Sequence, residues 1–281
     1  MTYFINLRGG DYGAVCSPYV LEGDPLSDPP AMASIPYESV PALVKGKDIL
    51  LITHGFNVGY VDGLRSLGRM ENLLAPTSAE RVFGVLWPGD WIIPAINYPF
   101  EENIASHAGQ LLGKFCNDWL SGSRSISFAS HSLGARVVLQ ATAALSRSAR
   151  NLCIMAGAVG ADCLTAEYQT AAANCDKIVT LSSMEDMVLA LAYPPGDLIA
   201  DILDDDHKPF EQALGRDGPD QPLILPSAAE QIDDEKDYGH GDYLPPSDMN
   251  TAVPDPNAKW TPVADFVARV FRNEDLSWPS A

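Results

Sequence analysis

The stretch from residue 125 to residue 139 constrains the fold of this chain more than any other. It reads SISFASHSLGARVVL, in which residues 126–129 are strand-like and the residues after Ser132 carry apolar side chains at helical spacing. A chain that turns from a strand into a helix within a residue strains the backbone at the apex, so the flanking side chains must be small. Ser130 and Gly134 meet that need. The stretch therefore predicts a strand, an abrupt turn at Ser132 and a helix.

This arrangement matches the nucleophile elbow, G-x-S-x-G, with Ser130 in place of the first glycine. The first N–H groups of the new helix have no partner within it and point toward whatever Ser132 attacks. The alternative interpretation is an ordinary serine that caps a helix after a strand. That alternative weakens if a suitable acid and histidine follow in the order that the elbow requires.

Length and composition allow one large α/β domain or two small ones. The chain has 281 residues, of which 46% are hydrophobic and 20% charged, so it can bury a sizeable core. We expect a single domain over residues 1–281. The formal net charge of −19 argues against nucleic acid and anionic membranes as partners, because phosphate groups would be repelled.

The cysteines and the first residues bear on the compartment. Five cysteines, an odd number without a C-x-x-C pair, are typical of reduced, mostly buried thiols in an intracellular protein. A bridge within the group from Cys153 to Cys175 is the less favoured alternative. Residues 1–8 lack the basic and apolar regions of a secretory signal, and no apolar run is long enough to span a bilayer. We therefore expect a cytoplasmic protein without a membrane span.

Strand-like and helix-like segments alternate along the chain, which predicts right-handed crossovers and a mostly parallel sheet flanked by helices. The segment 22–41, rich in Pro, Asp and Ser, is expected to be a surface loop. We expect strands at 3–7, 14–21, 48–53, 81–87, 126–129, 152–158 and 177–181. We expect helices at 60–74, 101–120, from the elbow to about 147, 165–174 and 263–271.

Residues 193–236 interrupt this alternation. They are rich in Pro and Gly and carry much of the acidic charge, which favours a lid or surface insertion before the last part of the chain. A calcium site on Asp204, Asp205 and Asp206 is a minor alternative, because the spacing lacks the EF-hand order and its loop glycine. We expect neither a metal nor a cofactor.

A serine nucleophile needs a base, and the base needs an orienting carboxylate. On a sheet of this kind the parts follow in the order nucleophile, acid, histidine. Asp186 is the favoured acid, since it follows a strand end and a turn of small residues and precedes Val188, which can anchor the loop. Its neighbour Glu185 is one alternative. Asp162, one strand earlier, is another.

The base is chosen among five histidines: His54, His107, His131, His207 and His240. His131 adjoins the nucleophile and should point away from it, His54 ends an earlier strand, and His107 lies within a helix. His207 falls in the acidic segment. His240 alone follows the acid on a glycine-rich loop before the last helix, so it is the predicted base. The alternative for His240 is an exposed loop histidine.

The backbone must also stabilise the negative charge that develops in the reaction. The amide of Leu133, directly after the nucleophile, and the amide of Phe56, in the loop after the strand ending at residue 53, are the predicted oxyanion donors. We also assign Phe56, Trp87 and His131 to substrate binding at the carboxyl edge of the sheet. For Trp87 and Trp91, packing in the core is an equally good interpretation.

Residues 44–244 resemble the α/β-hydrolase superfamily. The resemblance is carried by four motifs: His54-Gly55-Phe56-Asn57, Trp87-Pro88, Ser130-His131-Ser132-Leu133-Gly134 and His240-Gly241. The combination is most similar to the α/β hydrolases of unknown function called DUF900. The departure is the serine at position 130. The resemblance implies a hydrolase fold with a Ser-His-Asp triad, and it implies little about the substrate.

These observations predict a hydrolase of carboxylic esters that uses Ser132, His240 and Asp186 and needs no cofactor. The partner is a small-molecule or acyl ester, and the oligomeric state is left open. A lipase or thioesterase on the same triad is the nearest alternative, and a non-catalytic binding protein that retains the fold is the second. A metal-dependent hydrolase is weaker, since the chain has no H-x-H or H-E-x-x-H spacing.

Overall fold

The computed structural model describes residues 2–9, 14–89, 98–192, 212–224, 226–248, 257–274 and 276–278. Within them, nine strands form one sheet in the order β3-β2-β1-β5-β4-β6-β7-β8-β9. The strands are β1 (Thr2–Arg8), β2 (Val15–Asp24), β3 (Ala31–Ile35), β4 (Asp48–Thr53), β5 (Glu80–Leu86), β6 (Ser125–His131), β7 (Leu152–Met155), β8 (Ile178–Ser183) and β9 (Ala228–Ile232).

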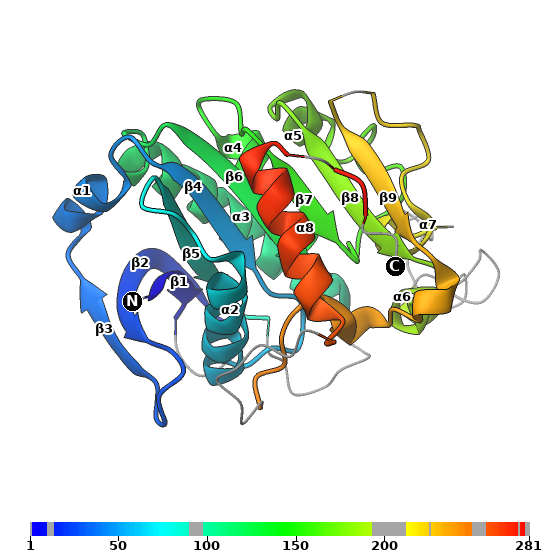
Figure 1. Ribbon diagram of the computed structural model, residues 1–281. Coiled ribbons are helices and arrows are strands. Elements are labelled where there is room, and N and C mark those ends of the chain that lie inside the picture. Colours follow the sequence, from blue (N-terminus) through cyan, green and yellow to red (C-terminus); the bar gives the residue numbers. More distant parts are fainter. Residues whose placement is uncertain are drawn as a thin grey trace.

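Eight α-helices and three 3-10 turns connect these strands in the described part of the chain. The helices are α1 (Val40–Val44), α2 (Tyr60–Leu74), α3 (Tyr98–Trp119), α4 (Gly134–Ala144), α5 (Gln169–Ala173), α6 (Met187–Ala192), α7 (Leu214–Asp217) and α8 (Trp260–Arg272). The 3-10 turns are η1 (Tyr37–Ser39), η2 (Asp234–Lys236) and η3 (His240–Tyr243). In Figure 1, α2 and α8 lie across one face of the sheet, and α3 and α4 lie behind the other.

The sheet is parallel from β1 through β5, β4, β6, β7 and β8 to β9, and only the pairs β1–β2 and β2–β3 are antiparallel. In the centre, Asp48 of β4 pairs with Ser125 of β6, and Thr53 pairs with Ser130. The amino ends of the parallel strands therefore meet at one edge of the sheet and their carboxyl ends at the other.

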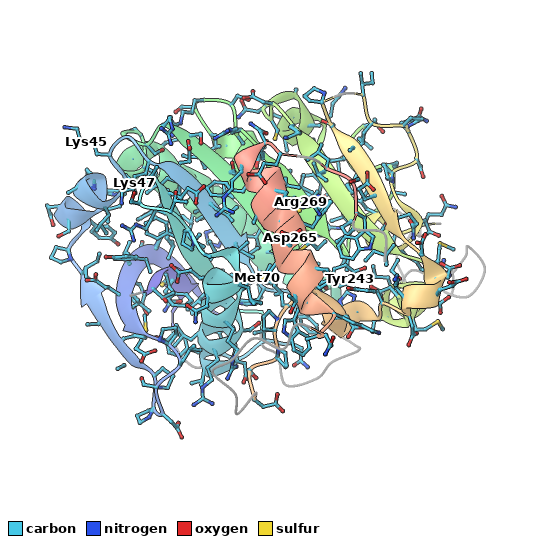
Figure 2. All side chains as sticks on the ribbon, viewed as in Figure 1. Lys45, Lys47, Met70, Tyr243, Asp265 and Arg269 are labelled. Atoms are coloured by element: carbon cyan, nitrogen blue, oxygen red, sulfur yellow. The ribbon has the colours of Figure 1, made fainter. Side chains whose placement is uncertain are left out.

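The central strands are largely apolar because helices cover both of their faces. Residues 49–52 of β4 are at most 1% exposed, and Phe83 of β5 and Phe128 of β6 are equally buried. Burial of each such side chain stabilises the fold by roughly 1.5–3 kcal/mol. Along α8, buried residues recur at helical spacing, while Asp265 and Arg269 form an ion pair one turn apart, with 2.9 Å between Oδ2 and Nε (Figure 2).

Two segments differ from the sequence prediction. Residues 22–41 were expected to form a loop, but 31–35 form the edge strand β3, which pairs with β2 and has no buried residue. An edge strand needs little apolar character, so its sequence resembles that of a loop. In the segment 193–236, residues 193–211 lie outside the described residues, while 228–232 form strand β9 of the sheet.

Several boundaries also shift. The helix after the elbow ends at Ala144 rather than near 147, the strand from Leu152 ends at Met155, and the helix predicted at 165–174 covers only Gln169–Ala173. The prediction of reduced, mostly buried thiols is confirmed: all five cysteines are free, and Cys116, Cys153 and Cys163 are buried.

No helix in the described ranges has the length and apolar character needed to cross a membrane.

Candidate active site

Ser132 lies at the apex of the turn between β6 and α4. Its φ of 55° is in the left-handed region, which a residue with a side chain adopts only where the surroundings enforce it. Two backbone hydrogen bonds do so: the Ser132 N–H donates to Met155 O at 3.1 Å, and the Ala158 N–H donates to Ser132 O at 3.1 Å. A Cβ at Gly134 would lie 2.5 Å from the carbonyl oxygen of His54, so only glycine allows α4 to start this close to the neighbouring strand end.

Ser132, His240 and Asp186 are joined by two short contacts. His240 Nδ1 is 2.8 Å from Asp186 Oδ2, and His240 Nε2 is 2.7 Å from Ser132 Oγ. The carboxylate can only accept, so Nδ1 carries the ring proton, Nε2 is the acceptor, and the Ser132 hydroxyl donates to it. Asp186 is fully buried, and its other oxygen accepts the Leu189 N–H at 3.0 Å. The histidine is thus held in the tautomer that can take a proton from the serine.

The backbone around His240 is fixed from two sides. The side chain of Asp242 accepts the Gly239 N–H at 2.8 Å and the Lys259 ammonium at 3.0 Å, which ties the 3-10 turn η3 to the start of α8. On the other side, His131 Nε2–H donates to the carbonyl oxygen of His240 at 2.7 Å. The loop of the predicted base is therefore held by Asp242 on one side and by His131 on the other.

His131 does not point away from the site, contrary to the sequence expectation. Its ring lies 4.9 Å from that of His240 and 5.9 Å from that of Tyr243, centroid to centroid. Burial, with the neighbouring His240, lowers the pKa of His131 to about 3. His131 therefore stays neutral at physiological pH and supports the His240 backbone as a donor. Its predicted contact with substrate remains a prediction.

The loop after β4 passes directly beside the nucleophile. A Cβ at Gly55 would lie 2.7 Å from Ser132 Cβ and 3.2 Å from both Ser132 Oγ and His131 Nδ1, so a side chain at this position would displace the serine. This close approach explains why a glycine stands here. It also places the following residue, Phe56, next to the site.

Residues 87–89 hold that loop in place. Trp87 Nε1–H donates to the carbonyl oxygen of His54 at 3.0 Å, and the Asn57 N–H donates to Gly89 O at 2.6 Å. The rings of His54 and Trp87 stack at 5.8 Å, and burial lowers the pKa of His54 to about 4. The two sequence motifs thus form one rigid support beneath the loop.

Trp87 is a correction to the sequence prediction. We expected it to bind substrate, but its side chain has no exposed surface and packs against His54. The alternative interpretation, packing in the core, describes its position. Trp91 lies outside the described residues.

The backbone N–H groups of the two predicted oxyanion donors are available to a substrate oxygen. In the part of the chain that the structure describes, no acceptor is paired with the backbone N–H of Leu133 or of Phe56. Leu133 follows the nucleophile at the start of α4, where the dipole of the helix adds positive potential. Their part in stabilising an oxyanion remains a prediction, since it depends on a bound substrate.

The competing acids and histidines stand apart from this cluster. Glu185 and Asp162 are exposed and make no contact with His240, whereas Asp186 does. His54 is fully buried beside Trp87, and His107 is exposed on α3. His207 and the aspartates 204–206 of the calcium alternative lie outside the described residues. Across the described ranges, no three His, Cys, Asp or Glu side chains lie close enough to hold a metal ion.

Sequence reasoning missed Tyr243. It comes from η3, next to the start of α8 (Figure 2), and its ring packs against His131. Its hydroxyl is buried without a partner in the described part of the chain. Burial and then the negative charge of Asp186 raise the pKa of this hydroxyl. The only signal in the sequence is its spacing of three residues from His240, which does not distinguish it from other loop tyrosines.

A strained serine at a strand–helix turn, bonded to a histidine that is bonded to a buried aspartate, on a mostly parallel sheet, defines the α/β-hydrolase class. The chain belongs to the family described as alpha/beta hydrolase of unknown function (DUF900), whose model matches residues 40–200. That range contains Ser132 and Asp186 and stops short of His240. No curated protein matches the chain.

Several solved structures of esterases are similar to the chain. Esterase PE8 is 15% identical, with 82% of this chain and 93% of that chain covered and a TM-score of 0.44. Carboxyl esterase 2 from the mycorrhizal fungus Tuber melanosporum is 12% identical, with 96% and 90% covered and a TM-score of 0.45. Acetyl xylan esterase 1 from Thermoanaerobacterium sp. JW/SL YS485 is 11% identical, with 96% and 87% covered and a TM-score of 0.46.

Proposed function

We propose that this protein hydrolyses carboxylic esters with Ser132 as nucleophile, His240 as base and Asp186 as the orienting acid. The observation that carries the proposal is the continuous chain of contacts from Ser132 Oγ through His240 to Asp186 Oδ2, at 2.7 and 2.8 Å. These separations lie within the range in which a base activates a hydroxyl nucleophile.

In the first half-reaction, Ser132 Oγ attacks the carbonyl carbon of the ester while its proton passes to His240 Nε2. The carbonyl oxygen becomes an oxyanion, which the N–H groups of Leu133 and Phe56 stabilise. When the tetrahedral intermediate collapses, the bond between carbon and the alkoxy oxygen breaks. The leaving alcohol takes the proton from Nε2, and the acyl group stays on Ser132.

In the second half-reaction, water attacks the acyl carbon and gives its proton to His240 Nε2. The intermediate collapses with cleavage of the bond to Ser132 Oγ, which regains the proton from the histidine. The carboxylic acid leaves and the serine is restored. Asp186 keeps its negative charge throughout and stabilises the imidazolium that forms twice in the cycle.

Side chains around Asp186 favour an apolar acyl group in the substrate. Large exposed hydrophobic side chains are few in the described part of the chain, and three of them, Met184, Met187 and Val188, flank Asp186. Clustered exposed apolar side chains are typical of binding surfaces. We therefore expect kcat/KM to rise with acyl length in a series of p-nitrophenyl esters, starting from acetate and butyrate.

The test compares turnover of p-nitrophenyl acetate and butyrate by the wild type, Ser132→Ala and Ser130→Ala. Ser132→Ala should lower kcat by about 10³-fold or more, because removal of the nucleophile removes the covalent route. Ser130→Ala is the matched control, since the Ser130 hydroxyl is buried without a described partner and takes no part in the reaction. EDTA should leave the rate unchanged.

A fluorophosphonate probe followed by peptide mapping locates the reactive residue independently of the substrate. The label should be found on Ser132 and should be absent in Ser132→Ala. Equal ester turnover by wild type and Ser132→Ala would support the non-catalytic binding protein instead. A label on any other residue would contradict the assignment of Ser132 as the nucleophile.

A further inference from the structure

A hollow lies at the edge of the sheet opposite Ser132, where the parallel strands begin. Its volume is about 890 Å³, and it is lined by the residues that open β4, β6 and β8 and by the loops before β7 and after α8. A volume of this size is typical of sites for small molecules, which occupy about 300–1,000 Å³. None of the residues proposed for ester hydrolysis lines it.

Positive charge is in excess in this cavity. Arg124, Arg147, Arg150 and Lys177 line it, against two carboxylates, Asp48 and Asp176. The chain as a whole has 18 basic and 37 acidic residues, so a local excess of cations runs against its composition. Like charges held together in a protein repel one another unless an anion compensates them.

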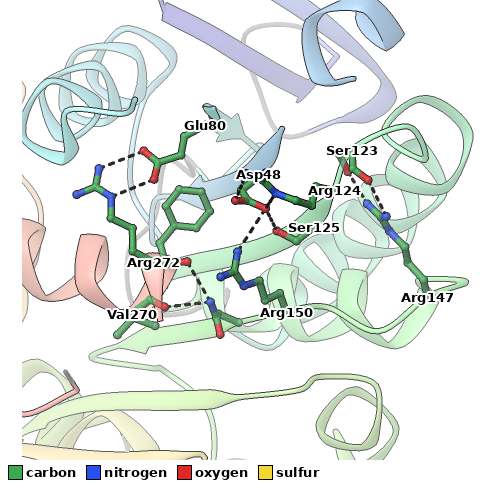
Figure 3. Close-up of polar contacts among 11 residues, drawn as sticks. Asp48, Glu80, Ser123, Arg124, Ser125, Arg147, Arg150, Val270 and Arg272 are labelled. Carbon is green, nitrogen blue, oxygen red and sulfur yellow. Dashed lines mark hydrogen bonds and ion pairs between the residues drawn. The ribbon is translucent and has the colours of Figure 1, made fainter. Parts of the chain in front are cut away.

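Asp48 neutralises only part of this charge, as Figure 3 shows. It accepts both Nε and Nη2 of Arg124, at 2.9 and 2.5 Å, and lies 3.3 Å from Nη1 of Arg150. Ser125 Oγ–H donates to the same carboxylate at 2.7 Å. One carboxylate is thus shared by two guanidinium groups, and all its oxygens are engaged.

Arg147 has no carboxylate partner within the described residues. Its guanidinium donates to the backbone oxygen of Ser123 at 3.0 Å and to the Ser123 hydroxyl (Figure 3), both of which are neutral. These bonds fix the direction of the side chain without cancelling its charge. The other carboxylate of the cavity, Asp176, accepts the Ser148 hydroxyl at 2.6 Å and forms no ion pair with Arg147.

Lys177 is the most informative residue of the cavity. It is only 7% exposed, and its ammonium has neither a hydrogen bond nor an ion pair to any residue that the structure describes. Burial and the nearby charge of Arg150 lower the pKa of Lys177. Lys177 lines the cavity with an ammonium that keeps access to solvent, so a bound anion can reach it and offset the cost of its partial desolvation.

Apart from Asp48 and Asp176, nearby groups that would repel an anion are bound to other residues and do not line the cavity. The last carbonyl oxygens of α8, those of Val270 and Phe271, accept Asn151 Nδ2 at 2.9 and 3.2 Å. Glu80 is bound by Arg272 at 3.0 Å (Figure 3) and does not line the cavity. The negative end of α8 is therefore covered where it approaches the cations.

We propose that this cavity binds the phosphate group of a small phosphate monoester. Arg147 and Lys177 supply two positive charges that no ion pair cancels, which suits a dianion. The planar fork of arginine matches the oxygens of phosphate, and the lysine adds a point charge beside it. The remaining volume accommodates the organic part of the molecule.

Isothermal titration calorimetry at constant ionic strength tests the site, with inorganic phosphate and glycerol 2-phosphate as probes and dimethyl phosphate, a monoanionic diester, for comparison. Both dianions should bind the wild type and Ser132→Ala with the same Kd, so this result does not depend on the esterase proposal. Dimethyl phosphate should bind at least about 10-fold more weakly, because one of the two charges is lost.

Lys177→Met and Arg147→Gln should each weaken phosphate binding by about 10-fold or more, since each removes one charge-assisted contact. Lys114→Met is the matched control, because Lys114 is exposed on α3 and lies outside the cavity. Unchanged ester turnover and an unchanged circular dichroism spectrum show that a variant is folded. If only one of the two cavity variants folds, that variant alone is enough to test the site. Absence of saturable phosphate binding by the wild type, or equal affinity in all three variants, would overturn the proposal.

Discussion

The two edges of the sheet are built from the same strands and differ in how their polar groups are held. β4 begins at Asp48 and leads into the His54 loop, and β6 begins at Ser125 and leads into Ser132. At the carboxyl edge, strained backbone and a close glycine place Ser132, and short hydrogen bonds place His240 and Asp186. At the amino edge, long charged side chains reach one another across strand ends.

This difference separates two kinds of task. Proton transfer between Ser132 and His240 requires a separation held to within a few tenths of an ångström, and glycines and backbone hydrogen bonds provide it. Attraction of an anion depends on net charge and tolerates small movements of arginine and lysine side chains. Variants at the carboxyl edge should therefore change rates, and variants at the amino edge should change affinity and leave rates alone.

The largest effect is expected for Asp186→Asn. An amide at this position donates to His240 Nδ1, so the proton moves to Nε2 and the histidine can no longer accept from Ser132. We expect kcat for p-nitrophenyl butyrate to fall by about 10⁴-fold, as expected when the tautomer is wrong. Glu185→Gln is the matched control, because Glu185 is the exposed neighbour with no contact to His240. A similar loss in both variants would show that the acid is misassigned.

The second prediction concerns acid stability. Unfolded histidine takes up a proton near pH 6.5, whereas folded His54 and His131 do so near pH 4 and 3. Between these values the unfolded state holds more protons, so the free energy of unfolding falls as the pH is lowered. Each histidine contributes a slope of up to about 1.4 kcal/mol per pH unit between its unfolded and its folded pKa.

Urea unfolding at several pH values measures this slope, and His54→Asn should reduce it by about the share of one histidine. At the amino edge, stability should depend on pH in a lower range. The hydrogen bond from Arg124 holds the pKa of Asp48 below its ordinary value of 3.8. The contribution of Asp48 to the free energy of unfolding is therefore complete above pH 3.8 and is lost as the pH falls through the lowered pKa. A variant His54→Asn with the wild-type slope would contradict the burial of a neutral imidazole.

Gly55→Ala should lower kcat by about 10²-fold, because the added methyl would lie 2.7 Å from Ser132 Cβ and displace the nucleophile. Gly241→Ala, one residue after His240, is the matched control, since nothing lies within 4 Å of a Cβ there. Rates measured beside thermal unfolding separate displacement of the serine from loss of the fold. If both variants kept wild-type rates, the loop after β4 would not border the nucleophile as described.

Much of the fold could be predicted from the sequence because the central elements have strong patterns. β4 and α2 have the predicted bounds, since one is a continuous apolar run and the other an amphipathic repeat. The edge strands β3 and β9 could not be found. Their stability comes from pairing with β2 and β8, and their own residues lack a strand pattern.

The candidate site could be predicted in part from the sequence for a similar reason. Chain order and motif singled out Ser132, Asp186 and His240, and the structure brings these three together. The position of His131 and the burial of Trp87 depend on packing between distant segments, which spacing along the chain does not encode. The basic cavity is harder still, because its cations come from separate strand ends and no motif links them.

The smallest effect is expected for Tyr243→Phe. This variant tests whether a hydroxyl that lies near the carboxyl edge without a described hydrogen bond contributes to stability or activity. The Tyr243 hydroxyl is buried without a described partner, so its removal should change the free energy of unfolding by less than about 0.5 kcal/mol, or stabilise the protein. Tyr238→Phe is the matched control: its hydroxyl donates to Lys259 O at 2.8 Å, and its loss should cost about 1 kcal/mol. Both variants keep the aromatic ring that packs in this region. Urea unfolding at pH 7.5 compares them, and ester turnover by Tyr243→Phe should match the wild type. A loss of activity without a loss of stability in Tyr243→Phe would show instead that this hydroxyl assists Asp186 during the reaction.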